Sequence, residues 1–174
     1  MSKVVLRKIN ELDTANIVRW RNSESVKMNL FTQSELSAEQ HLDWLKNKVE
    51  SGLCDQYIIV ISEDNTCTDV GTVIIKNIDR KNKKGEFGIF IGEESYRGKG
   101  YAQEATKQIL EIGFSELNLN RIYLYVMSDN IAGIKAYKKA GFEIEGILKE
   151  DYLRGDKFID IVVMGITKGK WKLR

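Results

Sequence analysis

The sequence contains no proline, one histidine (His41) and two cysteines (Cys54 and Cys67) among its 174 residues. The missing proline removes the usual signal of an interdomain linker. A single histidine excludes a multi-histidine metal centre, and the cysteines lack the CxxC spacing typical of zinc sites. We therefore expect residues 1–174 to form one domain without a metal.

Long apolar runs and a charge of one sign are also missing. No apolar run reaches the roughly 18–20 residues of a membrane-spanning helix, and the polar start Met1-Ser2-Lys3 lacks the apolar segment of a signal peptide. Twenty-seven basic and 25 acidic side chains give a formal charge of +2. The basic cluster 80–84 lies between two apolar runs, as expected for a solvated hairpin loop. We expect a cytoplasmic protein that binds neither membranes nor nucleic acid.

The first third of the chain predicts a strand over 3–9 and a helix over 11–21. Ser37 and Gln40 match a capping box, and the apolar spacing that follows predicts a second helix up to residue 51, ended by Gly52. The intervening residues 22–36 have the composition of a loop.

The middle of the chain changes to a strand period. Residues 57–61, 70–78 and 86–91 are apolar or β-branched and predict an antiparallel meander. In the last of these strands, Glu86, Gly88 and Phe90 should face one side of the sheet, and the alternate residues the other.

The second half of the chain alternates helices and strands. A long helix is predicted from the glycines near 98–100, a strand over 120–127, a helix over 131–140 capped by Asn130 and ended by Gly141, and strands over 142–148 and 158–167. The sequence therefore predicts a mixed α/β domain with a central sheet.

A glycine-containing turn connects the strand 86–91 to the long helix. The first N–H groups of a helix are unpaired and its dipole favours negative charge. Gly98 and Gly100 permit close approach, while Arg97 and Lys99 add positive charge, so a phosphate or pyrophosphate would fit. The loop matches neither GxGxxG nor GxxxxGK[ST], and a simple tight turn is the alternative.

Several motifs together resemble the GCN5-related N-acetyltransferases (GNAT). The family's acyl-CoA signature, Gln or Arg, two residues, Gly, one residue, then Gly or Ala, is met by Arg97, Gly100 and Ala102. A second cofactor segment is matched further on by Asn130, Ala132, Ala136, Tyr137 and the Gly141-Phe142 pair. The resemblance covers about residues 4–165 and is similar to the branches that acetylate ribosomal-protein alanine, polyamines and nucleotide-linked amino sugars.

The resemblance implies a GNAT fold of class α+β, with a mixed, mostly antiparallel sheet flanked by about four helices. It places acetyl-CoA between splayed strands at 86–91 and 122–127, with its thioester near the backbone N–H groups of the first strand. The implied cofactor-binding residues are Ile89, Phe90, Ile91, Arg97, Gly98, Lys99, Gly100, Tyr101, Ala102 and Asn130.

The resemblance also suggests two catalytic side chains. Tyr137 stands where many members carry the tyrosine that protonates the CoA thiolate, and a phenol with a reference pKa of about 10 is protonated at neutral pH. Glu86, at the start of the cofactor strand, is the candidate base for the amine. A partly buried aromatic for Tyr137 and a lysine ion pair for Glu86 are the structural alternatives.

The acceptor is an amine whose identity the sequence leaves open. Trp20, Arg21, Met28 and His41 resemble substrate-binding residues of enzymes that acetylate a nucleotide-linked amino sugar. Trp20 and Trp44 equally suit a helical core. A spermidine or spermine acceptor would need acids, for which the candidates are Glu35, Glu39, Glu93, Glu94, Glu150 and Asp151.

Two further alternatives remain open at this point. A ribosomal-protein N-terminus is a third acceptor, and a non-catalytic acyl-CoA sensor on the same fold is an alternative of another class. Relatives are commonly homodimers, although no residue here identifies an interface.

Overall fold

Seven strands form a single sheet in the computed structural model, which describes residues 2–64 and 66–173. The strand order is β1-β2-β3-β4-β5-β7-β6. The strands are β1 (Lys3–Lys8), β2 (Asp55–Glu63), β3 (Thr66–Asp79), β4 (Lys84–Ile91), β5 (Arg121–Met127), β6 (Glu143–Arg154) and β7 (Lys157–Thr167). All neighbours are antiparallel except β4 and β5. The predicted mixed, mostly antiparallel sheet is therefore confirmed.

The helices are α1 (Thr14–Asn22), α2 (Glu24–Lys27), α3 (Ala38–Trp44), α4 (Tyr101–Glu111), α5 (Ile131–Ala140) and α6 (Lys168–Lys172). The predicted Ser37–Gln40 capping box is present at the start of α3. The described residues thus include two short helices, α2 and α6, beyond the four expected. None of the described helices is long and apolar enough to cross a membrane.

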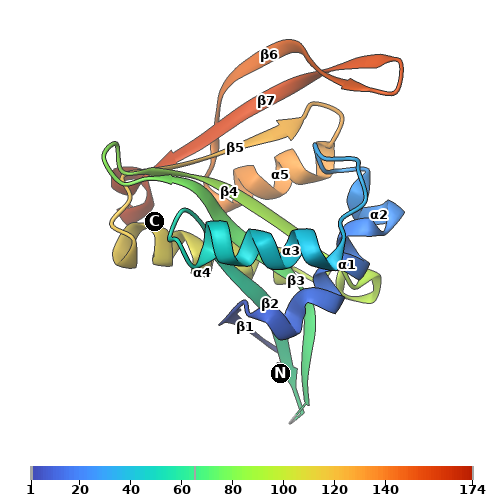
Figure 1. The fold of residues 1–174 in the computed structure, drawn as a ribbon. Coiled ribbons are helices and arrows are strands. Elements are labelled where there is room, and N and C mark those ends of the chain that lie inside the picture. The colour runs from blue at the N-terminus through green and yellow to red at the C-terminus, as the bar shows by residue number, and fades with distance from the viewer. Residues whose placement is uncertain (1, 65, 174) are drawn as a thin grey trace.

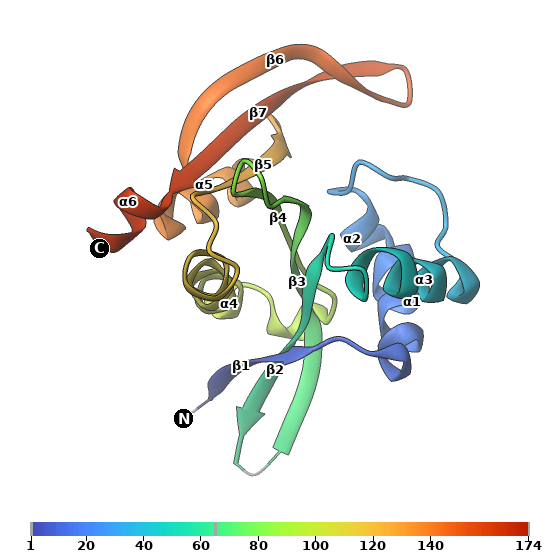
Figure 2. The ribbon, with the colours of Figure 1, turned by 60° about the vertical axis from the view of Figure 1, so that its left-hand side comes forward.

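The helices cover the sheet from both sides (Figure 2). On one side, α4 and α5 pack on the main core, which includes Ile109, Phe114 and Phe87. On the other side, α1 and α3 cover a smaller core of Ile17, Trp20, Leu45, Ile58 and related residues. The side chains of β4 alternate between the two faces of the sheet, as predicted. Phe87 enters the first core, and Phe90 packs against the second.

The sheet splits between its two parallel strands. β4 pairs with β5 only over Lys84↔Arg121, Gly85↔Ile122 and Glu86↔Tyr123. Beyond Glu86, the β5-facing edge of β4 therefore has no strand partner. The predicted splay between these strands is present, and it opens toward the glycine loop and α5.

Strand β6 extends beyond the predicted 142–148 to Arg154, whereas β7 matches the predicted 158–167 to within one residue, and the two form a long hairpin that projects from the sheet (Figure 1). The pairing of β6 shifts between Leu148 and Tyr152, and Glu150 adopts a positive φ of 53°. The hydroxyl of Tyr152 donates to the carbonyl of Phe31 at 3.0 Å. The hairpin consequently touches the segment between α2 and α3.

Candidate active site

A pocket of about 600 Å³ lies beside the end of β4, beyond the residues that pair with β5. Its walls come from the end of β4, the glycine loop, the start of α4, one face of α5, and α2. The lining residues on β4 and in the loop are Ile89, Phe90, Ile91, Tyr96, Arg97, Gly98, Gly100, Tyr101 and Ala102. Those on α5 and beside it are Asn130, Ala132, Gly133, Lys135, Ala136, Tyr137 and Lys139.

The glycine loop is built to approach an anion closely. Gly98 and Gly100 have positive φ angles of 72° and 85°, and a Cβ atom at either position would meet nothing within 4 Å. The first N–H groups bonded at this helix end are those of Gln103 and Glu104, which both donate to the Gly100 carbonyl at 3.1 and 3.2 Å. The preceding amides at the helix start are therefore available to a ligand, and the helix dipole favours a phosphate there.

Arg97 is a tether as well as a lining residue. Its Nε donates to the carbonyl of Ile91 at 3.0 Å, and its Nη2 donates to Ser25 Oγ at 3.1 Å. Lys99 is not among the lining residues, and its Nζ lies 5.4 Å from the centre of the Tyr96 ring. The arginine of the signature therefore holds the loop to β4 and α2.

Helix α5 presents Asn130 and Tyr137 to the same pocket. Asn130 caps the helix as predicted, because its Oδ1 accepts the Gly133 N–H at 2.9 Å. Tyr137 packs edge-on against Phe87, with ring centroids 5.8 Å apart. Burial raises the pKa of Tyr137 to about 12, so the phenol keeps its proton at neutral pH.

Glu86 lies at the closed end of the splay and is not a lining residue of the pocket. Its Oε1 is 3.0 Å from Lys76 Nζ, and its Oε2 accepts from Asn77 Nδ2 at 2.9 Å. Its side chain is 13% exposed. Glu86 is on the sheet face opposite Phe87, and therefore opposite the ring of Tyr137.

Comparison with known proteins identifies the family. A family model described as an acetyltransferase (GNAT) domain matches residues 3–143. The chain belongs to the GNAT acetyltransferases. It is accordingly an N-acetyltransferase that uses acetyl-CoA, as the resemblance implied.

The GNAT relatives include two named spermidine N(1)-acetyltransferases. The enzyme of Vibrio cholerae is 28% identical over 170 residues, covering 98% of this chain and 96% of the relative. That of Escherichia coli K12 is 29% identical over 170 residues and covers 92% and 91%. An uncharacterised N-acetyltransferase, p20 of Bacillus licheniformis, is 28% identical over 173 residues and covers 97% and 95%.

Solved structures confirm the GNAT fold. The spermidine N-acetyltransferase of Vibrio cholerae, in complex with CoA and spermine, superposes with a TM-score of 0.89 over 97% of this chain and 98% of that chain, at 24% identity. A structure of the Vibrio cholerae enzyme is described as dodecameric and gives a TM-score of 0.82 over 97% of this chain and 95% of that chain, at 24% identity.

Two features of the pocket in this GNAT chain suit acetyl-CoA. The open space above Gly98 and Gly100 adjoins the free helix amides, which suits a pyrophosphate. The gap beyond Glu86, where β4 lacks a strand partner, suits an extended pantetheine arm. Within the described ranges, no group of three or more His, Cys, Asp or Glu side chains is arranged to hold a metal.

Trp20 is not a substrate-binding residue in this structure. Its side chain is 1% exposed and packs in the core beneath α1 and α3. Its Nε1 donates to Glu93 Oε1 at 2.7 Å. The run of aromatic, arginine and asparagine suggested a ligand contact, but helical spacing turns the indole inward, which is the alternative that the sequence also allowed.

His41 is likewise interior. It is 2% exposed, and its Nδ1 lies 2.9 Å from Thr14 Oγ1. Burial lowers the pKa of His41, while the nearby Asp13 carboxylate opposes that shift. The expected substrate contact is therefore wrong for His41, which instead joins α1 to α3.

Met28 lies next to the pocket, whereas Arg21 is not one of the lining residues. Met28 is 57% exposed and directly precedes Asn29 and Leu30, which line the pocket. Arg21 is partly buried, and desolvation lowers its pKa. Among the described residues, no salt bridge or side-chain hydrogen bond is formed by its guanidinium.

Sequence reasoning missed the contribution of α2. Ser25 and Val26 on α2 line the pocket, as do Asn29 and Leu30 just after it, but residues 22–36 have the composition of a loop, and only Met28 among them was an expected substrate contact. The Ser23-Glu24 pair, typical of a helix start, was the available signal. A second cavity of about 520 Å³ lies between α4 and α6, around Phe114 and Trp171, and contains none of the predicted site residues.

Proposed function

We propose that this chain transfers the acetyl group of acetyl-CoA to a primary amine of a polyamine such as spermidine. The observation that carries the transfer is the pocket beside the end of β4, which joins the glycine loop to Tyr137. The acceptor class is supported by the spermidine acetyltransferases among the relatives and by the placement of acidic residues described below.

In this proposal, the amides of residues 98–102 bind the pyrophosphate, and Asn130 contacts the cofactor from α5. The pantetheine arm lies along Ile89, Phe90 and Ile91, where unpaired strand backbone can orient the thioester. A fixed backbone donor at the thioester oxygen stabilises the tetrahedral oxyanion, and loss of one such donor in other enzymes costs about 10²–10³-fold in rate. Holding both reactants in line supplies much of the remaining acceleration.

Tyr137 and Glu86 have separate proton roles in the proposal. Tyr137, which stays protonated at neutral pH because burial raises its pKa, gives its proton to the departing CoA thiolate. Glu86, which does not line the pocket, receives the proton of the amine through water. Its position at the last β4–β5 pair, on the face opposite Tyr137, supports this division, because the amine then approaches from the opposite side of the thioester.

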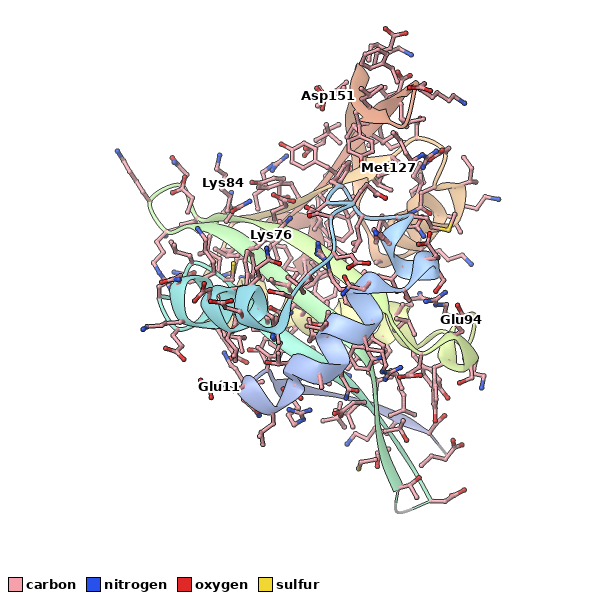
Figure 3. All side chains as sticks on the ribbon, turned by 45° about the vertical axis from the view of Figure 1, so that its right-hand side comes forward. Glu11, Lys76, Lys84, Glu94, Met127 and Asp151 are labelled. Carbon is pink, nitrogen blue, oxygen red and sulfur yellow. The ribbon has the colours of Figure 1, made fainter. Side chains whose placement is uncertain are left out.

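Acidic residues on two contacting segments support a cationic acceptor. The contact between Phe31 and Tyr152, with rings 5.4 Å apart and nearly perpendicular, brings the segment before α3 against the β6–β7 hairpin. These segments carry Glu35, Glu150 and Asp151, all exposed. Figure 3 shows Asp151 in the projecting hairpin. By contrast, Glu93 is held by Arg19 and Trp20 and is less suited to receive an ammonium group.

One observation favours a nucleotide-linked amino sugar as a second candidate. A desolvated guanidinium is costly without an anion, and Arg21 has no carboxylate partner within the described ranges. A diphosphate would supply that partner with bidentate geometry. This candidate predicts that the acceptor carries phosphate.

Release of CoA thiol from acetyl-CoA tests the proposal, with spermidine, spermine, a 4-amino-dideoxy nucleotide sugar and an N-terminal alanine peptide offered separately. We expect turnover with the polyamines. Turnover confined to the nucleotide sugar, and lost in Arg21→Gln, would replace the polyamine proposal by the second candidate. Acetyl-CoA binding without turnover on any amine would contradict both.

A further inference from the structure

The second cavity, of about 520 Å³, shares no lining residue with the acetyl-CoA pocket within the described part of the chain. Its walls come from the later turns of α4, the segment Ile112–Glu116 that follows α4, the last residue of α5, and α6. Figure 2 shows α6 on the same side of the sheet as α4 and α5. Small-molecule sites have volumes of roughly 300–1,000 Å³. The cavity is therefore large enough for a small ligand of its own.

Two aromatic side chains contribute to the wall of this cavity. Phe114 is 1% exposed and belongs to the main core. Trp171, on α6, is partly buried, and its ring lies 6.1 Å from that of Phe114 at an angle of 36°. Aromatic rings pack well on one another in offset or edge-on arrangements. This wall therefore favours a ligand with a planar ring.

Three lysines give the cavity positive charge. Lys107 lies on α4, and Lys168 and Lys172 lie four residues apart on α6, which places them on one face of that helix. Within residues 2–64 and 66–173, none of the three forms a salt bridge. Lys168 Nζ donates to the neutral amide oxygen of Asn118 at 3.2 Å. The lysines can therefore receive an anion.

Glu111 supplies one carboxylate to the cavity, and both of its oxygens are already engaged. Oε1 accepts from Ser115 Oγ at 2.6 Å, and Oε2 accepts from Trp171 Nε1 at 2.8 Å. These two bonds lower the pKa of the Glu111 carboxyl. Glu111 thus orients the indole of Trp171 instead of pairing with Lys107, which lies one helical turn before it. One negative and three positive side chains leave the cavity with a net positive charge.

We propose that this cavity is a binding site for a small planar aromatic anion. The ring of the ligand packs against Trp171, and its phosphate, sulfonate or carboxylate group is bound by the three lysines. A lysine ammonium acts on such groups as a point charge, so the site selects a ring joined to a negative charge and not one particular acid. The site does not depend on the proposed acetyl transfer, because acetyl-CoA is placed in the other pocket.

A titration with 1-naphthyl phosphate, followed by NMR of the tryptophan indole N–H signals, tests the site. The chain has three tryptophans, and Trp171→Phe identifies the Trp171 signal by its loss. We expect a saturable shift of that signal with a Kd below about 1 mM. Trp20 and Trp44 pack in the smaller core on the other side of the sheet, so their signals should stay unchanged. 1-Naphthol and inorganic phosphate, which carry the ring or the charge alone, should bind at least about tenfold more weakly.

Charge variants locate the bound anion. Lys107→Gln and Lys172→Gln should each weaken the binding of 1-naphthyl phosphate about threefold, the effect of one partly exposed charge pair. Glu111→Gln removes the negative charge and should strengthen binding by a similar factor. Lys170→Gln is the matched control, because Lys170 lies on the same helix but pairs with Glu143 and is not a lining residue. It should leave the Kd unchanged.

Three results would overturn the proposal. The first is the absence of a saturable shift of the Trp171 signal at 1-naphthyl phosphate concentrations up to about 10 mM, well above the expected Kd. The second is equal affinity for 1-naphthol or for inorganic phosphate, since the cavity would then not require a ring and a charge together. The third is equal weakening in Lys170→Gln and Lys107→Gln, which would show a non-specific attraction to the basic surface.

Discussion

The side chain of Tyr137 lies in an apolar environment that keeps its phenol neutral. It packs against Phe87 and Phe142, and burial raises its pKa to about 12. Ionisation of this phenol should therefore cause no decline in kcat below about pH 10, the reference value for an exposed tyrosine. A fall in kcat at pH 8–9 caused by deprotonation of Tyr137 would contradict its raised pKa.

Replacing Tyr137 by Phe removes the proton donor but keeps the ring packing. We expect kcat to fall about 100-fold, the lower end of general acid catalysis, while acetyl-CoA affinity stays within a few-fold. Single-turnover kinetics and a direct acetyl-CoA titration measure the two quantities. Unchanged turnover would remove Tyr137 from the mechanism and leave it as a packing residue.

His41 should make the fold sensitive to acid. Its Nδ1 meets Thr14, and its Nε2 is buried without a hydrogen-bond partner in the described part of the chain. Burial lowers the pKa of His41 in the folded state, although Asp13, itself bonded to Arg7, opposes the shift. The unfolded chain then takes up a proton first, near the reference pKa of about 6.5. Stability present above that pH is lost as the pH falls toward the folded-state pKa.

The variant His41→Gln removes this titration. Chemical unfolding at pH 7.5 and pH 5 should show a smaller loss of unfolding free energy in the variant than in the wild type. The wild-type loss from this group cannot exceed about 1.4 kcal/mol per pH unit. Parallel pH dependences in the two proteins would contradict the assignment.

At the scale of single elements, the sequence predicts best where backbone and side chain act locally. The Ser37–Gln40 capping box, the Asn130 cap, the left-handed Gly141 and the alternation along β4 are all present. Each depends on residues within one turn or one strand. Trp20 and His41 failed as ligand contacts because their environment is set by α3 and the sheet, which are distant in sequence.

The longer elements show the same limit. Helix α2 forms within the expected loop because Arg97 and the core at Val26 hold it, and neither contact is visible in residues 22–36. The β6–β7 hairpin extends to Arg154 and Lys157 through pairing between strands. Sequence patterns alone do not measure such pairing when the residues are polar and exposed.

Substitutions at two glycines of the β4–α4 connection should distinguish effects on CoA binding from effects on stability. In Gly98→Ala, the new Cβ meets nothing within 4 Å. The substitution therefore strains the backbone, which has a positive φ of 72°, and obstructs the pocket. We expect the unfolding free energy to fall by about 1 kcal/mol and CoA affinity to fall at least about tenfold.

In Gly92→Ala, the Cβ instead collides with the Trp20 ring, at 2.1–2.5 Å from three of its atoms. The expected cost is about 1–3 kcal/mol of stability, as for other overpacked sites. Denaturant unfolding and CoA titration of both variants test the distinction. Wild-type CoA affinity in Gly98→Ala would show that the loop does not hold the phosphates.

The whole molecule has a weak connection across its sheet. The strands β1–β4 on one side and β5, β7 and β6 on the other meet through only three β4–β5 residue pairs. Packing of α4 and α5 supplies the rest of the contact through the shared core around Phe87 and Leu124. A ligand in the pocket contacts β4 on one side and α5, which follows β5, on the other, and should stabilise the two parts together.

Thermal unfolding tests this view of the split sheet. A ligand at 100 times its Kd adds about 2.7 kcal/mol to folding stability, which for a chain of this size raises Tm by about 5 °C or more. We expect CoA to give this shift, together with slower hydrogen exchange in both β4 and β5.

Adenosine 3′-phosphate 5′-diphosphate is the control, because it carries the phosphates without the pantetheine arm. At the same multiple of its own Kd it should protect the glycine loop but leave exchange in β5 unchanged. Equal protection of β5 by both ligands would show that the stabilisation is transmitted from the loop through the core, and that nothing in the split itself binds the arm.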